Sequence, residues 1–378
     1  MLHLNRQAIK QHADEWKQAG IATYQFDDAA VAAETKKAPQ WVHFGGGNIF
    51  RAFIAALQQH LLNNGQAKTG IITAETYDEE VIEKVYRPFD NLSLAVTMYA
   101  DGRFENEVIG SVVDSVVCRL DFAEDWNRLK EIFTNPSLQI ASFTITEKGY
   151  KLTNYAGEYF PAVAEDMKNG PEKATSSMGC IAALAYARYK AGAYPFAFLS
   201  MDNCSHNGDK IKAAMTTFAD AWVKNGVADA DFADYINNPQ KVTFPWSMID
   251  KITPRSSAKV QDYLKGLGFE DTDLIHTEKG TYAAFVNAEN AQYLVIEDTF
   301  PNGRPALENS GVIFTDRATV DKVERMKVCT CLNPLHTALA VYGCLLGYTL
   351  IADEMKDAQL KGLIEKIGYQ EGLPVVTN

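Results

Sequence analysis

A short apolar strand, a glycine turn and an amphipathic helix follow one another between residues 40 and 62. The turn is Gly45-Gly46-Gly47-Asn48, and the apolar residues after it recur at helical spacing. Glycines let a backbone approach a pyrophosphate closely, and the N–H groups at a helix start hold its negative charge. This order predicts a Rossmann-type α/β domain. A structural loop remains an alternative, because Phe50 stands where the usual pattern has a third glycine.

The turn and the next strand predict which dinucleotide is bound. We assign Gly45, Gly47, Asn48, Phe50 and Arg51 to the cofactor site. The following apolar run, 70–74, ends in an acidic stretch, where a carboxylate binds a ribose 2′-hydroxyl and repels a 2′-phosphate. This favours NAD over NADP. The candidate acids are Glu75 first and Asp78 second.

Further apolar, β-branched runs at 94–98, 107–117 and 140–145 are typical of strands that continue the same sheet. Thr146 and Glu147 follow the last of these runs, at a carboxyl end where open α/β sheets place ligands, so we add both to the cofactor site. Beyond about residue 240 the alternation of strands and helices gives way to loops and helices. We therefore expect a dinucleotide-binding domain over 1–285 and a mainly helical substrate domain over 286–378.

A second stretch carries groups that can exchange or direct protons. Lys327, Asn333 and His336 lie in a mostly apolar segment. Burial penalises a charged ammonium and makes a lysine a better proton acceptor, while an amide can donate to a developing oxyanion. The alternative is purely structural: a lysine beside a helix, an Asn-Pro helix start and a core histidine.

Composition narrows the class of partner. A net charge of −12 argues against nucleic acid, and the apolar run 337–352 is too short to span a bilayer. The six cysteines lack the spacing of a disulfide framework and no set of four metal ligands stands out, so we expect no metal. Without a basic-then-apolar leader, the expected location is the cytoplasm.

With these segments in hand, the chain resembles the mannitol dehydrogenase family, the polyol-specific long-chain dehydrogenases and reductases. The motifs that carry the resemblance are the glycine turn at 45–52, residues 144–150, 201–203 with 207–208, 247–250 with 252–254, 297–298 with 302–305, and Lys327, Asn333 and His336.

The resemblance implies a metal-independent, NAD-dependent oxidation of a secondary alcohol of a sugar acid or polyol, on a Rossmann domain followed by a mainly helical domain. It implies that Lys327 is the general acid/base and that Asn333 and Asn203 stabilise the oxyanion. His336 would orient Lys327 or a substrate hydroxyl, and Asp250 would bind a hydroxyl. For a carboxylated substrate, Arg304 is a candidate cation, as are Arg255 and Lys148.

One spacing departs from the family. The family pattern is Lys-x4-Asn-x2-His, whereas five residues separate Lys327 from Asn333 here. On an unbroken helix the extra residue would move Lys327 and His336 to opposite faces. We therefore predict irregular backbone between Lys327 and Asn333. It is either a π-bulge or a break after which Asn333 caps a new helix with Pro334 at its first position.

Within the family, residues 74–78 and 331–337 most resemble the branch that interconverts D-mannonate and D-fructuronate. Mannitol 2-dehydrogenase or tagaturonate reductase chemistry remains the alternative, as does a dinucleotide-binding protein without turnover. A short-chain dehydrogenase would instead use a Tyr-x3-Lys pair, a spacing that Tyr186 and Lys190 have. Family members usually continue with further helices, so we expect a C-terminally truncated substrate domain. The oligomeric state stays open.

Overall fold

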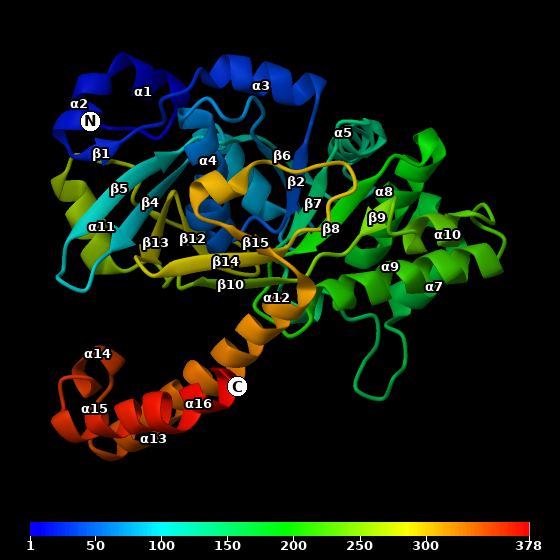
Figure 1. The fold of residues 1–378 in the computed structure, drawn as a ribbon. Coiled ribbons are helices and arrows are strands. Elements are labelled where there is room, and N and C mark those ends of the chain that lie inside the picture. Colours follow the sequence, from blue (N-terminus) through cyan, green and yellow to red (C-terminus); the bar gives the residue numbers. More distant parts are fainter. Residues whose placement is uncertain (378) are drawn as a thin grey trace. The chain divides into compact units, whose positions relative to one another are not determined.

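The structure is a computed structural model that describes residues 1–377 (Figure 1). Two compact units divide the chain. The first comprises Met1–Leu294 and Asp298–Ile313, and the second comprises Val295–Glu297 and the residues from Phe314 onward. The domain division at 285/286 stays a prediction.

A six-stranded sheet with the order β6-β3-β2-β7-β8-β9 organises the first unit. Every neighbouring pair in it is parallel. In sequence order this is the 3-2-1-4-5-6 arrangement of a Rossmann fold, with the order reversing between β2 and β7. The predicted α/β fold class is confirmed. The strands are β2 (Trp41–Phe44), β3 (Ile71–Glu75), β6 (Val112–Val117), β7 (Ile140–Phe143), β8 (Phe196–Ser200) and β9 (Val242–Thr243).

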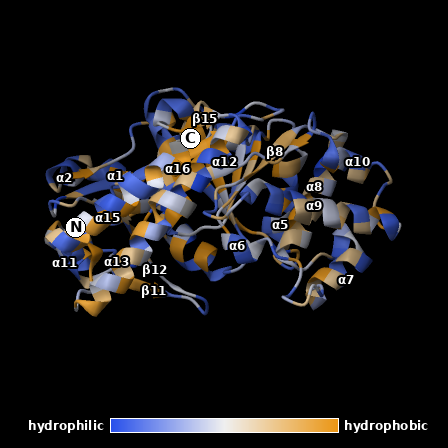
Figure 2. Ribbon diagram, turned by 60° about the horizontal axis from the view of Figure 1, so that its bottom comes forward, coloured by the Kyte–Doolittle hydropathy of each residue, from blue (hydrophilic) through white to orange (hydrophobic). Residues whose placement is uncertain are grey.

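These strands read as continuous apolar runs because both faces of a parallel sheet are covered by helices. On one face, Phe44, Phe143 and Phe198 belong to a core cluster. The helices α5 (Ala123–Thr134), α8 (Ser177–Gly192) and α9 also contribute to it. Helix α9 (Asn207–Lys224) buries apolar residues such as Phe218, and Figure 2 shows polar and apolar stretches mixed along it. An amphipathic pattern of this kind keeps one helix face on the sheet and the other in water.

A second, four-stranded sheet corrects part of the strand assignment. Its order is β1-β5-β4-β13, with β4 and β5 antiparallel. The runs 94–98 and 107–109 therefore do not continue the Rossmann sheet, and the run 107–117 is divided between two sheets. Apolar strands look alike in sequence whichever sheet they join. The bounds are β1 (Ile21–Ala22), β4 (Ser93–Met98), β5 (Phe104–Ile109) and β13 (Phe285–Glu289).

The remaining strands are short. They are β10 (Ser247–Lys251), β11 (Leu274–His276), β12 (Thr281–Ala283), β14 (Gln292–Glu297) and β15 (Ile313–Thr315). Strands β11 and β12 pair antiparallel and form a hairpin.

The α-helices of the first unit mostly connect its strands. Their bounds are α1 (Arg6–Gln11), α2 (Ala13–Gln18), α3 (Asp28–Lys37), α4 (Ala55–Asn63), α5 (Ala123–Thr134), α6 (Thr146–Gly149), α7 (Pro161–Asn169), α8 (Ser177–Gly192), α9, α10 (Phe232–Asn237) and α11 (Ala258–Gly266). Two π-helical segments, η1 (Phe50–Ile54) and η2 (Ile82–Tyr86), and three 3₁₀ turns, η3 (Arg87–Phe89), η4 (Pro171–Lys173) and η5 (Leu307–Ser310), complete the unit.

The second unit is mainly helical. It contains α12 (Arg317–Glu324), η6 (Arg325–Cys331), α13 (Asn333–Leu345), α14 (Ile351–Glu354), α15 (Ala358–Glu365), η7 (Lys366–Gly372) and α16 (Leu373–Thr377). Among the described residues, the stretch Arg317–Leu345 is the one helix whose length and composition would suffice to cross a membrane. Core helices of soluble proteins pass the same test, so this finding alone assigns no membrane role.

The buried His43 of β2 gives stability a defined pH dependence. Its ring nitrogens lie 2.7 Å from Ser142 Oγ and 2.8 Å from Thr144 Oγ1, and the ring stacks on Phe50. Burial lowers the pKa of His43 from 6.5 to about 3. The unfolded chain therefore takes up a proton near pH 6.5 that the folded chain does not. The stabilisation that depends on neutral His43 is fully present above that pH and is lost as the pH falls below it. Between pH 7 and pH 5 the free energy of unfolding should decrease by about 2 kcal/mol from this residue.

Urea denaturation of the wild type and of His43→Gln at pH 7 and pH 5 measures this contribution. The wild type should lose more stability on acidification than the variant does. An equal loss in both proteins would contradict the assignment to His43.

Candidate functional site

A cavity of about 600 Å³ lies at the carboxyl ends of the parallel strands of the first unit. Its walls come from the glycine turn after β2, the acidic turn after β3 and the loop after β7, on either side of the point where the strand order reverses. Open parallel sheets bind their ligands in this place. The predicted cofactor residues that line the cavity are Gly45, Gly47, Glu75, Asp78 and Thr146.

The glycine turn is shaped by the close approach of β2 and β7. Gly45 has a φ of +105°, and a Cβ there would lie 2.2 Å from the backbone oxygen of Thr144. Only glycine fits both conditions. Gly47 lines the cavity and has no atom within 4 Å of its would-be Cβ, so the space beside it is open to a ligand. The helix that starts here suits an anionic group such as a pyrophosphate.

Phe50 and Arg51, assigned to the cofactor from the sequence, place their side chains in the core, and their contact with a cofactor stays a prediction. Both side chains are buried and neither lines the cavity. The Arg51 guanidinium donates to Ser93 Oγ (2.9 Å) and to the backbone oxygen of Ala283 (2.8 Å), and Phe50 stacks on His43. Their place inside the first turn of the helix points them into the protein. Asn48, at the start of this helix, is partly exposed.

The Glu75 carboxylate is held by backbone N–H groups. It accepts from Gly46 N (2.8 Å) and from Thr76 N and Tyr77 N (both 3.0 Å). Burial raises the pKa of Glu75, and these hydrogen bonds oppose the shift. The carboxylate thus ties the glycine turn to the acidic turn. Its predicted contact with a ribose remains a prediction.

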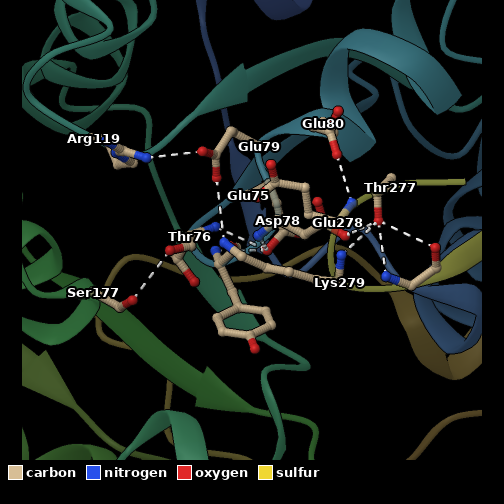
Figure 3. A network of polar contacts seen from close by, with 12 residues as sticks. Glu75, Thr76, Asp78, Glu79, Glu80, Arg119, Ser177, Thr277, Glu278 and Lys279 are labelled. Atoms are coloured by element: carbon tan, nitrogen blue, oxygen red, sulfur yellow. Dashed lines mark hydrogen bonds and ion pairs between the residues drawn. The ribbon is translucent and has the colours of Figure 1, made fainter.

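Asp78 contacts the hairpin β11–β12 rather than solvent (Figure 3). Its Oδ2 accepts from Thr277 Oγ1 at 2.7 Å and from the Tyr282 hydroxyl at 3.3 Å. The same hairpin brings Lys279 within 3.5 Å of the Glu79 carboxylate, to which Arg119 also pairs at 3.0 Å. These ion pairs tie the acidic turn to the hairpin, and Glu79, Arg119 and Lys279 line a second pocket of about 490 Å³, which shares Thr76 and Tyr77 with the cavity.

The loop after β7 is held from the end of β8. Thr146 has a φ of +64°, which is rare for a β-branched residue. The Asp202 carboxylate accepts from its N–H at 2.8 Å. Glu147 is exposed and pairs with Lys210 at 3.1 Å. Asn203, the predicted oxyanion amide, follows Asp202 directly and is exposed.

The predicted substrate residues of the first unit differ in their surroundings. Asp250 lies in β10 and is partly exposed. The guanidinium of Arg304 pairs with the carboxylates of Asp298 (2.8 Å) and Glu308 (2.6 Å), and the Asp298 hydrogen bond in particular raises the Arg304 pKa. Two anions already neutralise this cation, so its role toward a substrate carboxylate stays a prediction. Arg255 and Lys148 are exposed.

The second unit confirms the predicted irregular backbone around Lys327. Residues 325–331 form a π-helix, and Leu332 N donates to the backbone oxygen of Lys327 at 2.8 Å. An i→i+5 turn accommodates one more residue than an α-turn, so it absorbs the extra residue between Lys327 and Asn333. Helix α13 then begins at Asn333, with Pro334 in its first turn, where the missing N–H does no harm.

Burial separates the three candidate groups of this segment. Lys327 is buried at 4% exposure, whereas Asn333 and His336 are exposed. Lys327 thus differs from the other two in being shielded from solvent, and its role as the general acid/base stays a prediction. Tyr186 and Lys190, the alternative pair, do not line the cavity, and Lys190 pairs with Asp229 at 2.6 Å.

Two features of the site were missed from the sequence. Asp202 stood inside a recognised motif, but only its neighbour Asn203 received a role. The hairpin residues Thr277 and Lys279 lie some 200 positions from the acidic turn that they contact, and no local pattern announces such a pairing.

Comparisons with known proteins agree with this geometry. The family model described as "Mannitol dehydrogenase Rossmann domain" matches residues 39–309. D-mannonate oxidoreductase of Thermotoga maritima is 54% identical over all of this chain, which covers 70% of that protein. Polyol:NADP oxidoreductase of Gluconobacter oxydans is 30% identical, with 89% of this chain and 65% of the relative covered.

A solved structure of mannitol 2-dehydrogenase from Pseudomonas fluorescens, a ternary complex with NAD and D-mannitol, superposes with a TM-score of 0.76 at 29% identity. The match covers 99% of this chain and 69% of that one. The chain thus spans about two thirds of the length of these relatives. From the matched domain and the relatives together, the chain belongs to the mannitol dehydrogenase family.

Proposed function

We propose that this chain interconverts D-mannonate and D-fructuronate with NAD as the hydride carrier. The observation that carries the proposal is the 54% identity, over the whole chain, with a D-mannonate oxidoreductase. The cavity at the switch point of the sheet supports a dinucleotide, because it combines an open space at Gly47 with a helix start. The binding partner would be a small sugar acid, and we expect neither nucleic acid nor a membrane as a partner. The expected location is the cytoplasm.

The residues divide the work by chemistry. When bound, NAD supplies the hydride acceptor at its nicotinamide ring. Lys327 would take the proton of the substrate hydroxyl, and the amides of Asn203 and Asn333 would donate to the oxygen on which negative charge develops. His336 would orient Lys327 or a second hydroxyl, and Asp250 would accept a hydrogen bond from the sugar. These roles, the 1–285 and 286–378 domains, and Glu75 as the acid that disfavours NADP all belong to the proposal.

Steady-state rates of NADH formation with D-mannonate, D-altronate and D-mannitol test the substrate. We expect D-mannonate to be oxidised with the highest kcat/KM, and NAD to be preferred when NADP replaces it. A preference for D-altronate or D-mannitol would assign the chain to another branch of the family. Dinucleotide binding without turnover on any of the three would favour the non-catalytic alternative.

A further inference from the structure

The carboxylate of Asp202 joins the ends of two neighbouring strands. It follows β8, yet its oxygens accept from Ile145 N (3.0 Å) and Thr146 N (2.8 Å), the residues that follow β7. The Tyr150 hydroxyl donates to it at 2.6 Å. Both oxygens are therefore engaged, and these three donors belong to one short segment, 145–150.

This segment is a wall of the cavity and is held in a costly conformation. Thr144, Ile145 and Thr146 line the cavity. Thr146 sits at a φ of +64°, which for a threonine persists only where the surroundings enforce it. Asp202 accepts from the N–H of Thr146 itself and from that of the preceding residue, Ile145, so these two hydrogen bonds can enforce the conformation.

Asp202 is itself fixed on the other side. The buried Asn207 donates from Nδ2 to the backbone oxygens of Asp202 and Ser247, both at 3.0 Å, and Ser247 N donates back to Asn207 Oδ1 at 3.0 Å. This rigid support ties Asp202 to β10 as well as to β8. The Asp202 carboxylate is thus held in place by β8 and β10, and it in turn holds the loop after β7.

We propose that Asp202 is a positioning residue that holds the loop after β7 as the wall against which the nicotinamide half of the dinucleotide binds. The inference rests on the proposed function. Strands β7, β8 and β9 form the second half of the sheet, whereas the glycine turn and the acidic turn belong to the first half, which takes the adenosine side. Loss of Asp202 should therefore affect the two ends of the dinucleotide unequally.

Calorimetric titration of the full chain with NADH and with ADP separates the two ends. Asp202→Asn keeps the shape but cannot accept from all three donors, so the Kd for NADH should rise about tenfold while the Kd for ADP stays within about twofold. Tyr150→Phe removes one of the three donors and should raise the Kd for NADH by a smaller factor, about threefold. Asp28→Asn is the matched control. That carboxylate is buried and bonded to Lys10 and Tyr24, does not line the cavity, and its loss should change neither Kd.

Unchanged NADH affinity in Asp202→Asn would overturn the inference. So would equal losses for NADH and ADP, which would mean that Asp202 only supports the fold. If Asp202→Asn does not fold, Tyr150→Phe decides the matter by the same two constants. A wild-type chain that binds ADP but not NADH would refute the inference and the proposed function together, whereas normal NADH binding by both proteins would refute the inference alone.

Discussion

Replacing Lys327 with Met should lower kcat for D-mannonate oxidation by about a thousandfold and leave NADH affinity nearly unchanged. Methionine fills the space of the buried lysine stem but cannot accept a proton. Since the hydroxyl must lose its proton as the hydride departs, turnover would lack its general base. Stopped-flow or steady-state kinetics gives kcat, and fluorescence titration gives the Kd for NADH.

The matched control is Lys322→Met, which removes an exposed lysine of α12 a little more than one turn away. It should turn over at the wild-type rate. If Lys327→Met retains turnover within about tenfold of the wild type, Lys327 is not the acid/base, and the role must pass to another group. A loss of NADH binding in the variant would instead indicate damage to the fold.

Gly45→Ala should produce the largest loss of stability among substitutions in the cavity wall, about 3 kcal/mol or more. Two costs combine: the left-handed backbone at φ +105° and a Cβ placed 2.2 Å from the backbone oxygen of Thr144. Because that oxygen is backbone, β2 and β7 would have to separate at the point where the dinucleotide binds. Urea denaturation measures the stability, and NADH titration should show no binding at micromolar concentration.

Substitutions at two other glycines distinguish the backbone cost of Gly45→Ala from its steric cost. Gly20 has a φ of +71° and no atom near its would-be Cβ, so Gly20→Ala should cost only the backbone term, about 1 kcal/mol. Gly47→Ala should leave stability within about 0.5 kcal/mol but weaken NADH binding, because the added methyl would enter the cavity. Equal losses of stability at Gly45 and Gly20 would refute the steric argument.

Local sequence signals predicted the parts of the site that local geometry determines. The order strand, glycine turn, helix placed Gly45 and Gly47 on the cavity, and the single extra residue after Lys327 predicted the irregular backbone that the π-helix 325–331 provides. Each of these follows from constraints within a few residues. Helix periodicity and the demands of a tight turn are visible without any knowledge of distant contacts.

The parts that sequence reasoning missed depend on contacts across the fold. The strand 93–98 has the same apolar pattern as a Rossmann strand, yet it pairs with Phe285–Glu289 nearly 200 residues later. Arg51 belongs to a familiar motif, but its guanidinium finds backbone oxygens near β12. Glu75 is an acidic residue at the predicted position, but its carboxylate accepts a hydrogen bond from Gly46 N. Residue type shows what a side chain can do, and packing decides which partner it meets.

Transfer of deuterium from the cofactor to the sugar acid tests the central claim most directly. The purified chain would be incubated with D-fructuronate and NADH deuterated at both C4 positions, and the product analysed by mass spectrometry. The account predicts D-mannonate that is one mass unit heavier than the product made with ordinary NADH, formed about a thousandfold more slowly by Lys327→Met. Absence of labelled D-mannonate with the wild-type chain would contradict hydride transfer to this substrate.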